Sequence, residues 1–458
     1  MKHSKAQLRA RFHKIPTLGF EDQKLTSFAG LVLFQALFVR LDLKARLKTC
    51  FLHIDASSSY SVHRVVLLLV LQLIMGFRRL RDVDYYRGDP LVERIAGLRA
   101  LPDASTISRT LAQLDAESVE RVRALSTALV LERLEREQFS RLTLDFDGSV
   151  LSTKRHAEGS AVGFNKQKKG ARSYYPLFCT VAQTGQFFDL HHRPGNVHDS
   201  NGAGEFISAC LGVARESFPG AALESRLDSA FFSKDLLPLF DEHGAEFTIS
   251  VPFERLAELK GIIEARERWN DIDGEWSYFE RDWKPKSWDR RYRFLFVRRR
   301  VKKQIKGPLQ LDLFEPRDFD FEYKVIVTNK RQEAGAVVQF HNGRGSQEAV
   351  FGDAKQDAGL GVIPAKRLEA NQTYTLCAMM AHNLSRELQM LAKPPRKRTT
   401  AKRRAPWTFE TLHTLRHRLI QRAGRLTRPQ GKLTLTMSGN KKVKKELLHF
   451  LDCVEKAA

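Results

Sequence analysis

Two aspartates lie two positions apart in a segment with the pattern of a β-strand. In RLTLDFDGSV (141–150), apolar residues alternate with Thr143, Asp145 and Asp147, so these three polar side chains share one face of the predicted strand. Burying a carboxylate in a sheet is costly unless it is paired or bound to a metal ion, so this pattern indicates a use for the acids. The alternative is an edge strand whose acids are solvated.

A further acid, Asp228, ends the strand-like LESRLD and opens the turn DSAFF. Ligands of open α/β sheets bind at the carboxyl ends of strands, so Asp147 and Asp228 are expected in one region if their strands are neighbours. The alternative is that Asp228 only caps the helix expected from Ser233.

Four polar residues follow helical spacing in FHNGRGSQEAVFGDAKQD (340–357). His341, Arg344, Glu348 and Lys355 stand at offsets 0, 3, 7 and 14, which places them within about 60° of one another on a helix. Two glycines interrupt the segment, so the helix is expected to begin only near residue 346. The alternative is a polar stripe on the helix surface.

Three carboxylates from two strands and a helix suit two-metal phosphoryl chemistry. Asp147, Asp228 and Glu348 offer the oxygen ligands that Mg²⁺ prefers, with Mn²⁺ as a substitute. Two such ions activate an attacking water or 3′-hydroxyl and stabilise the leaving oxygen. In this hypothesis Arg344 and Lys355 hold DNA phosphate as a fork and as a point charge, and His341 is a further DNA-binding candidate.

The order of elements around these acids predicts an α/β fold with a ribonuclease H-like core, a mixed sheet flanked by helices. Three meandering strands precede alternating helices and parallel strands, which is the order of that fold. The predicted strands are 141–150, 173–182, 185–196, 221–230 and 245–252, and the predicted helices are 202–216 and 233–242.

Residues 1–135 predict an N-terminal all-α domain, because apolar residues recur there at helical intervals. Near its end, PDASTISRTLAQL (102–114) predicts a capped helix with Thr106, Ser108 and Arg109 near its beginning. That helix is similar to the second helix of a helix-turn-helix. The alternative is a surface helix in a bundle.

Two further regions complete the predicted domain organisation. Residues 253–335 hold four of the five tryptophans and predict a β-rich insertion that divides the catalytic core into 136–252 and 336–391. The remainder, 392–458, predicts a basic C-terminal tail with a flexible stretch at 394–406 and a helix at 407–426. From Leu391 onward it has 18 Lys and Arg against 4 Asp and Glu, which is +14 of the chain's +23.

Composition limits the class of protein. A chain of 458 residues with 42% hydrophobic content forms packed cores, and a net charge of +23 favours a polyanionic partner, nucleic acid before membrane. The five cysteines form no CxxC pair, which indicates reduced thiols and a cytoplasmic location. The longest apolar run, 65–71, is far shorter than a membrane span, so no membrane partner is expected.

These residues resemble the bacterial DDE-type insertion-sequence transposases, most closely insertion-sequence family thirteen-eighty. The resemblance spans nearly the whole chain. Its most specific part is the pattern Y-x2-R-x3-E-x6-K, which reads here His341-x2-Arg344-x3-Glu348-x6-Lys355, with histidine in place of tyrosine. Further matching segments are LTSFAGLVLF, GDPLVERI, PDASTISR, LDFDGS, GFNKQKKGARSYYPL, RPGN, RLDSAFF and RLIQRAGRLTR.

The resemblance implies that Asp147, Asp228 and Glu348 are the DDE triad. Asp147 is preferred as the first acid because Gly148 and Ser149 follow it, and Asp145 is the fallback. The family implies that the protein binds terminal inverted repeats, with residues 1–135 as the N-terminal DNA-binding domain, cleaves the DNA ends and joins the 3′-hydroxyls to target DNA. It also implies a homodimer in the paired-end complex and a bacterial, nucleoid-associated location when bound.

Two other functions remain open from the sequence. One is a ribonuclease H-like nuclease or resolvase that cuts without strand transfer, against which the N-terminal domain and the basic tail argue. The other is a non-catalytic DNA-binding protein derived from a transposase, whose usual marker is the loss of a triad acid.

Overall fold

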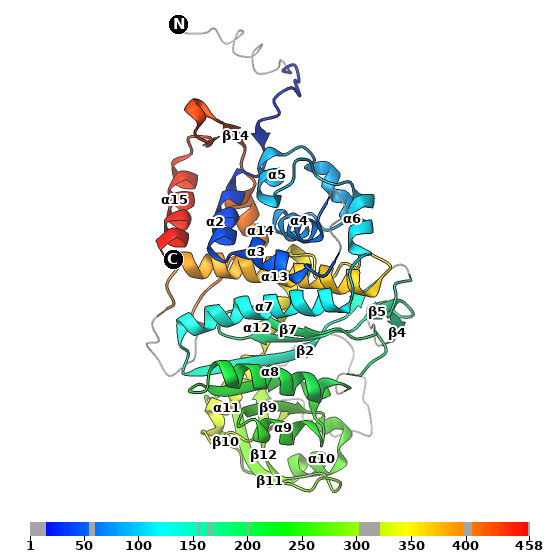
Figure 1. Ribbon diagram of the computed structural model, residues 1–458. Coiled ribbons are helices and arrows are strands. Elements are labelled where there is room, and N and C mark those ends of the chain that lie inside the picture. The colour runs from blue at the N-terminus through cyan, green and yellow to red at the C-terminus, as the bar shows by residue number, and fades with distance from the viewer. Residues whose placement is uncertain are drawn as a thin grey trace.

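The computed structural model describes residues 15–54, 60–153, 156–163, 165, 168–198, 201–301, 321–396 and 405–456. A helical layer lies on one side of a long sheet; most of its helices lie beyond helix α13 (Leu368–Ala392), whereas α7 (Ala116–Glu137) lies between α13 and the sheet (Figure 1). Most of the basic stretch predicted at 394–406 lies outside the described residues.

The centre of the molecule is a nine-stranded mixed sheet in the order β10-β11-β12-β13-β9-β8-β2-β6-β7. Strand β2 pairs antiparallel with β6, and β6 pairs antiparallel with β7, whereas β8 runs parallel to β2 and β9 parallel to β8. A mixed sheet flanked by helices agrees with the expected fold class, and its five core strands follow the order from which the ribonuclease H-like core was predicted. Those strands are β2 (Arg141–Gly148), β6 (Leu177–Val181), β7 (Gln186–His191), β8 (Ala222–Leu227) and β9 (Glu246–Val251).

The two faces of β2 have different surroundings. Its apolar face packs on α8 (Ala203–Ser217), where the rings of Phe146 and Phe206 lie 6.1 Å apart. Its polar face points to α12 (Gly345–Asp357), whose N-cap residue Arg344 contacts Asp147. Helix α9 (Leu236–Glu242) contributes Phe240 to the hydrophobic cluster that contains Phe146 and Phe206, and α11 (Ala334–Asn342) contacts β9 through His341 and Thr248. The alternation of the sequence therefore puts the packing residues on one face of β2, and Asp145 and Asp147 on the other.

The region predicted as a β-rich insertion continues the core sheet. Strand β13 (Phe321–Thr328) pairs antiparallel with β9, and β12 (Tyr292–Arg300), β11 (Trp276–Trp283) and β10 (Asn270–Asp271) follow outward. Phe279 and Trp283 share one hydrophobic cluster with Leu144 of β2, and α10 (Ala257–Glu264) contributes Leu259 to it. The inserted strands thus use the edge of β9 and share their core with the predicted catalytic region.

The helical layer and the C-terminal segment share one hydrophobic core. The layer consists of α2 (Val32–Arg40), α3 (Leu43–Cys50), α4 (Val62–Met75), α5 (Pro90–Ala96), α6 (Ala104–Leu111) and α7 (Ala116–Glu137). Leu447 and Phe450 of α15 (Lys441–Lys456) lie in the same cluster as Leu37 of α2 and Leu384 of α13. Figure 1 shows α15 beside α2, above the end of α13. A three-stranded sheet joins the two chain ends, because β14 (Gly424–Thr427) pairs with both β1 (Leu25–Thr26) and β15 (Thr434–Met437).

The described part of the predicted tail is therefore a packed component of the fold. The helix predicted at 407–426 is also too long: α14 (Leu412–Leu415) continues only into a π-helical turn, Arg416–Ile420. The buried Arg416 explains the change of direction, since its guanidinium donates to the backbone oxygens of Leu73 (2.7 Å), Ile74 (2.6 Å) and Asp357. Burial lowers the pKa of Arg416 to about 10.

A small sheet follows strand β2 in the chain. It consists of β3 (Leu151–Ser152), β5 (Arg172–Tyr174) and β4 (Ala161–Val162). The RPGN segment closes on it, because Tyr174 forms an isolated bridge with Pro194 and a Cβ at Gly195 would overlap Ser173. This segment of the resemblance therefore serves local packing in the structure.

Candidate active site

The carboxyl ends of β2 and β8 place Asp147 and Asp228 next to each other. These parallel strands pair Asp145 with Arg226, so Asp147 and Asp228, two residues further along each strand, stand at one level on neighbouring strands about 4.8 Å apart. Asp228 keeps an extended backbone (φ −84°, ψ −176°), so both carboxylates point to the face on which Asp145 meets Arg226. Asp228 also accepts a hydrogen bond from the backbone nitrogen of Ala230 at 3.0 Å.

Helix α12 brings two cations to the same edge. Arg344 Nη1 lies 3.3 Å from Asp147 Oδ2, and Lys355 Nζ lies 3.5 Å from the backbone oxygen of Val150. Burial lowers the pKa of Lys355, and the nearby Asp147 carboxylate opposes that shift. Glu348 lies one turn after Arg344 and two turns before Lys355, so it shares their helix face, and it is exposed.

The donor set of Asp147, Asp228 and Glu348 fits a hard divalent ion, since all three offer carboxylate oxygens. The Asp147 side chain is 22% exposed, Asp228 is half-buried and Glu348 is exposed, so none is sealed from solvent. The three carboxylates do not all lie within 4.8 Å of one another. Binding one ion with all three therefore requires side-chain rotation, for which Glu348 has the longest and most exposed side chain.

A different group of potential metal ligands has its ligand atoms within 4.8 Å of one another. Within the described ranges it is the only group of three or more His, Cys, Asp or Glu residues that does so, and it consists of His53, Asp115 and Glu117. Asp115 caps α7 through Ser118, and Glu117 pairs with Arg121. Helix capping accounts for this group, which belongs to the helical layer.

Asp145, the alternative candidate for the first acid, is buried in an ion pair with Arg226. It is 1% exposed, and its two carboxylate oxygens accept hydrogen bonds from Arg226 Nε at 2.7 Å and Nη2 at 2.6 Å. A buried guanidinium thus occupies both oxygens, and the geometry favours Asp147 as the first acid.

His341 is not placed to contact DNA phosphate, contrary to the sequence-based expectation. It belongs to α11 rather than to α12, and it is 1% exposed. Its ring nitrogens lie 2.9 Å from Ser250 Oγ and 3.0 Å from Thr248 Oγ1. Burial, with Lys324 and Arg344 nearby, holds the pKa of His341 well below its ordinary value. The ring is therefore a neutral packing group between α11 and β9.

Thr106, Ser108 and Arg109 lie in the helical layer, apart from the acidic edge. Asp103 caps α6 by accepting from the Thr106 backbone nitrogen at 2.7 Å, and Ser108 and Arg109 are exposed. Residues 97–103 separate α5 from α6, whereas a helix-turn-helix has a turn of about 3–4 residues. The length of this connection therefore favours the alternative interpretation of α6 as a surface helix in a bundle.

Sequence reasoning missed three residues beside the site. Arg226 and Gln347 contact Asp145 from β8 and α12, and Lys324 of β13 lies near Arg344. Burial lowers the pKa of Lys324 to about 8, with Arg344 adding to the shift. Arg226 stands two residues before Asp228, and Gln347 stands directly before Glu348. This closeness to the candidate acids is the sequence feature that could have identified Arg226 and Gln347.

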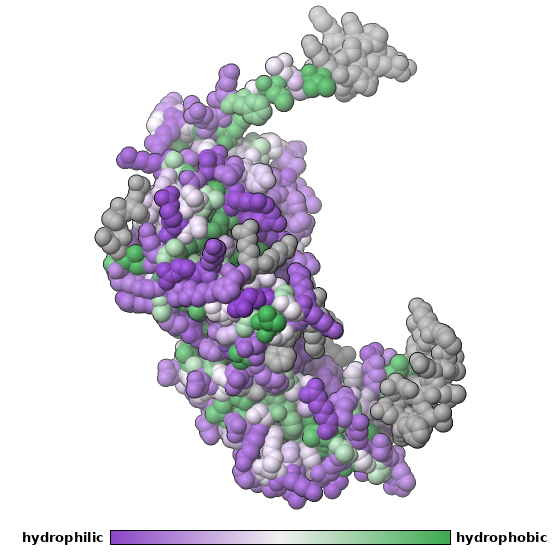
Figure 2. Space-filling view, turned by 90° about the vertical axis from the view of Figure 1, so that its right-hand side faces the viewer, coloured by the Kyte–Doolittle hydropathy of each residue, from purple (hydrophilic) through white to green (hydrophobic). Residues whose placement is uncertain are grey.

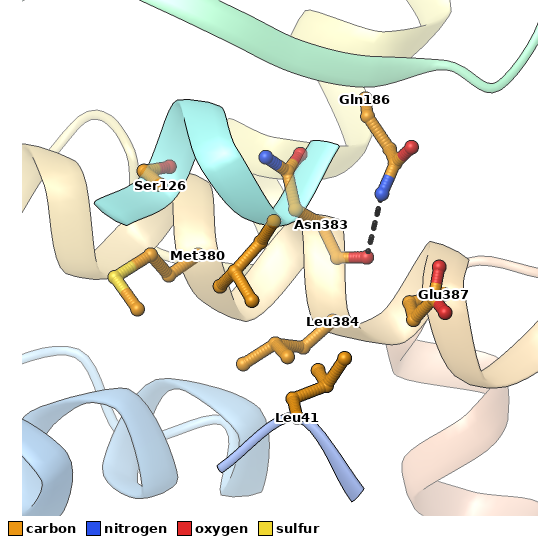
Figure 3. A pocket seen from close by; sticks show the side chains of 8 residues that line it. Leu41, Ser126, Gln186, Met380, Asn383, Leu384 and Glu387 are labelled. Carbon is orange, nitrogen blue, oxygen red and sulfur yellow. Dashed lines mark hydrogen bonds between the residues drawn. The ribbon is translucent and has the colours of Figure 1, made fainter. Parts of the chain in front are cut away.

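The cavities differ in what they can hold. The one in Figure 3, lined by Leu41, Ser126, Gln186 and Asn383 among others, has a volume of about 10 Å³, at the lower limit for holding a single water molecule. Gln186 Nε2 bonds the backbone oxygen of Asn383 across it. A cleft of about 230 Å³ has Thr143, Arg226, Gly343 and Ser346 among its lining residues, and none of the three candidate carboxylates lines it.

Hydrophilic side chains dominate the face in Figure 2, and hydrophobic ones form small scattered patches. Among the helices of the described residues, none is long and apolar enough to cross a membrane.

The chain matches the family model described as "Transposase DDE domain group 1" over residues 9–458. Because the match spans nearly the whole chain, the protein belongs to this family of DDE transposases. No curated protein matches the chain.

Solved structures of transposases are similar at low identity. The structure titled "Cryo-EM structure of piggyBac transposase synaptic complex with hairpin DNA" shares 12% identity over 78% of this chain and 74% of that chain, with a TM-score of 0.40. The "Mos1 transposase paired-end complex with left transposon end" shares 9% identity over 42% of this chain and 60% of that chain, with a TM-score of 0.18. The family assignment rests on the family model alone.

Proposed function

We propose that this DDE transposase, most similar to insertion-sequence family thirteen-eighty, binds the terminal inverted repeats of its own element. It cleaves the DNA ends and joins the freed 3′-hydroxyls to target DNA. The observation that carries the proposal is the placement of Asp147 and Asp228 on adjacent strand ends, faced by Arg344 and Lys355 from one helix.

Asp147, Asp228 and Glu348 are the proposed catalytic residues and the proposed ligands of Mg²⁺ or Mn²⁺. When bound, these ions supply Lewis acidity toward the attacking and leaving oxygens. Arg344 is proposed to grip a phosphate with its planar fork, exchanging its contact with Asp147 for the DNA. Lys355 adds a second positive charge from the same helix face, and the two cations together orient the phosphodiester for in-line attack.

The helical layer is proposed to read the DNA ends. Ser108 and Arg109 are exposed on α6, and Thr106 stands on the same short helix. Exposed lysines of α15 add phosphate contacts without base specificity. A homodimer that pairs two ends, in a bacterial cytoplasm and on the nucleoid when bound, completes the proposal.

The test uses the DNA that flanks the gene. We expect matching inverted repeats there, and we expect the purified protein with Mg²⁺ to nick labelled repeat DNA at the repeat tip and to join pre-cut ends to a target plasmid. Cleavage without joined products would instead support the nuclease or resolvase, and repeat binding without cleavage the non-catalytic DNA-binding protein.

A further inference from the structure

A buried polar cluster lies directly beneath the proposed catalytic residues. Arg226 donates two hydrogen bonds to the Asp145 carboxylate, at 2.7 and 2.6 Å, and the two side chains are 8% and 1% exposed. Gln347 Nε2 donates to the backbone oxygen of Asp145 at 2.9 Å and to Thr180 Oγ1 at 3.0 Å. The cluster thus joins β2, β8, α12 and β6.

Each member of the cluster is a near neighbour of one triad residue in sequence. Asp145 precedes Asp147 by two residues, Arg226 precedes Asp228 by two, and Gln347 directly precedes Glu348. Fixing the three members against one another therefore fixes the backbone from which all three carboxylates project. We propose that Asp145, Arg226 and Gln347 are positioning residues that hold Asp147, Asp228 and Glu348 in the register needed to bind the divalent ions. This inference rests on the proposed function.

The packing around Arg226 supports this role independently. Its Nη1 donates to the backbone oxygen of Phe340 at 3.2 Å, and its guanidinium lies over the Phe340 ring, 5.3 Å from the centroid. A Cβ added at Gly343 would overlap the same guanidinium. The break between α11 and α12 thus leaves room for Arg226, and the guanidinium ties the end of α11 to the strands.

A buried ion pair is weak evidence for stability, because desolvation offsets much of its Coulomb attraction. Its geometry nevertheless specifies position, since a guanidinium fork and a carboxylate pair in one plane with two parallel hydrogen bonds. Removing one partner leaves an unpaired buried charge and destabilises the fold, whereas apolar replacement of both partners is often tolerated. The two roles, stability and positioning, can therefore be separated.

The chain offers a matched control for this separation. Arg133 and Glu387 form another buried ion pair, 5% and 6% exposed, between α7 and α13. We expect both double variants, Asp145→Leu/Arg226→Met and Arg133→Met/Glu387→Leu, to fold with unfolding midpoints close to wild type. Only the first is expected to weaken Mn²⁺ binding, by about tenfold or more, as measured on the full chain without DNA by electron paramagnetic resonance.

Cleavage provides the second readout. The first double variant is expected to need at least about tenfold more Mn²⁺ for half-maximal cleavage, while its affinity for inverted-repeat DNA stays within about twofold of wild type. Gln347→Met introduces no buried charge, so it tests the helix contact even if the double variant fails to fold. We expect it to raise the half-saturating Mn²⁺ concentration as well.

If the Asp145→Leu/Arg226→Met variant folds and binds Mn²⁺ as the wild type does, the inference is wrong. If this double variant does not fold, wild-type Mn²⁺ binding by Gln347→Met overturns the inference instead. Failure of the proposed function gives different results. In that case the Asp147→Asn variant binds Mn²⁺ as the wild type does, or the wild-type protein does not cleave repeat DNA.

Discussion

The packing of α15 predicts that two adjacent leucines differ sharply in their effect on stability. Leu447 is 6% exposed in the core shared with α2 and α13, whereas Leu448 is 54% exposed. Truncating Leu447 to alanine removes three carbons, about 2.4 kcal/mol of transfer free energy, and the cavity raises the total cost to about 3–5 kcal/mol. Leu448→Ala loses only the buried half of that transfer term, about 1 kcal/mol, and leaves no cavity.

Urea unfolding of the full-length variants, followed by circular dichroism, measures this difference. The free energy of unfolding for Leu447→Ala should lie at least about 2 kcal/mol below that for Leu448→Ala. Equal effects of the two substitutions would show that α15 is detached from the core. In that case the interpretation of residues 392–458 as a separate basic tail would be restored.

Three further predictions concern charge. Replacing the exposed lysines of α15 by glutamine should lower the salt dependence of DNA binding by about 0.9 in slope for each phosphate that is no longer neutralised, and an unchanged slope would remove this surface from the interface. These lysines are Lys441, Lys442, Lys444 and Lys445. Burial raises the pKa of Asp353 to about 6 from 3.8, so the folded state retains a proton that the unfolded state releases. Stability should therefore fall as pH rises through this window, and Asp353→Asn should flatten that fall in urea titrations at several pH values; an identical pH profile would contradict it. Arg344→Gln should slow cleavage about 100-fold with Arg344→Lys intermediate in single-turnover assays, and equal rates for lysine and glutamine would argue against a phosphate fork.

The strands and the acidic edge could be predicted because their signals are local. Alternation in RLTLDFDGSV separates the apolar face from the face with Asp145 and Asp147, and the structure keeps that separation. Which of the two acids is committed to packing could not be predicted. That depends on the parallel register that sets Arg226 opposite Asp145, a pairing 81 residues apart in sequence.

The errors at His341 and in the C-terminal region have a common cause. His341 follows helical spacing with Arg344, but the break between α11 and α12 turns its ring toward Thr248 and Ser250. In the C-terminal region, the abundance of lysine and arginine hid an amphipathic helix whose Leu447 and Phe450 face α2 and α13. Long-range packing decided both cases, and composition and spacing do not report it.

The central claim is that Asp147, Asp228 and Glu348 together perform metal-dependent DNA cleavage. The most direct measurement is single-turnover cleavage of labelled repeat DNA with Mg²⁺ by Asp147→Asn, Asp228→Asn and Glu348→Gln. The exposed Glu322→Gln serves as the control, and repeat binding is measured in parallel. We predict that each of the three variants binds the repeat but loses cleavage by at least about 1,000-fold, while the control cleaves as the wild type does. Wild-type cleavage by any one of the three would contradict its place in the triad.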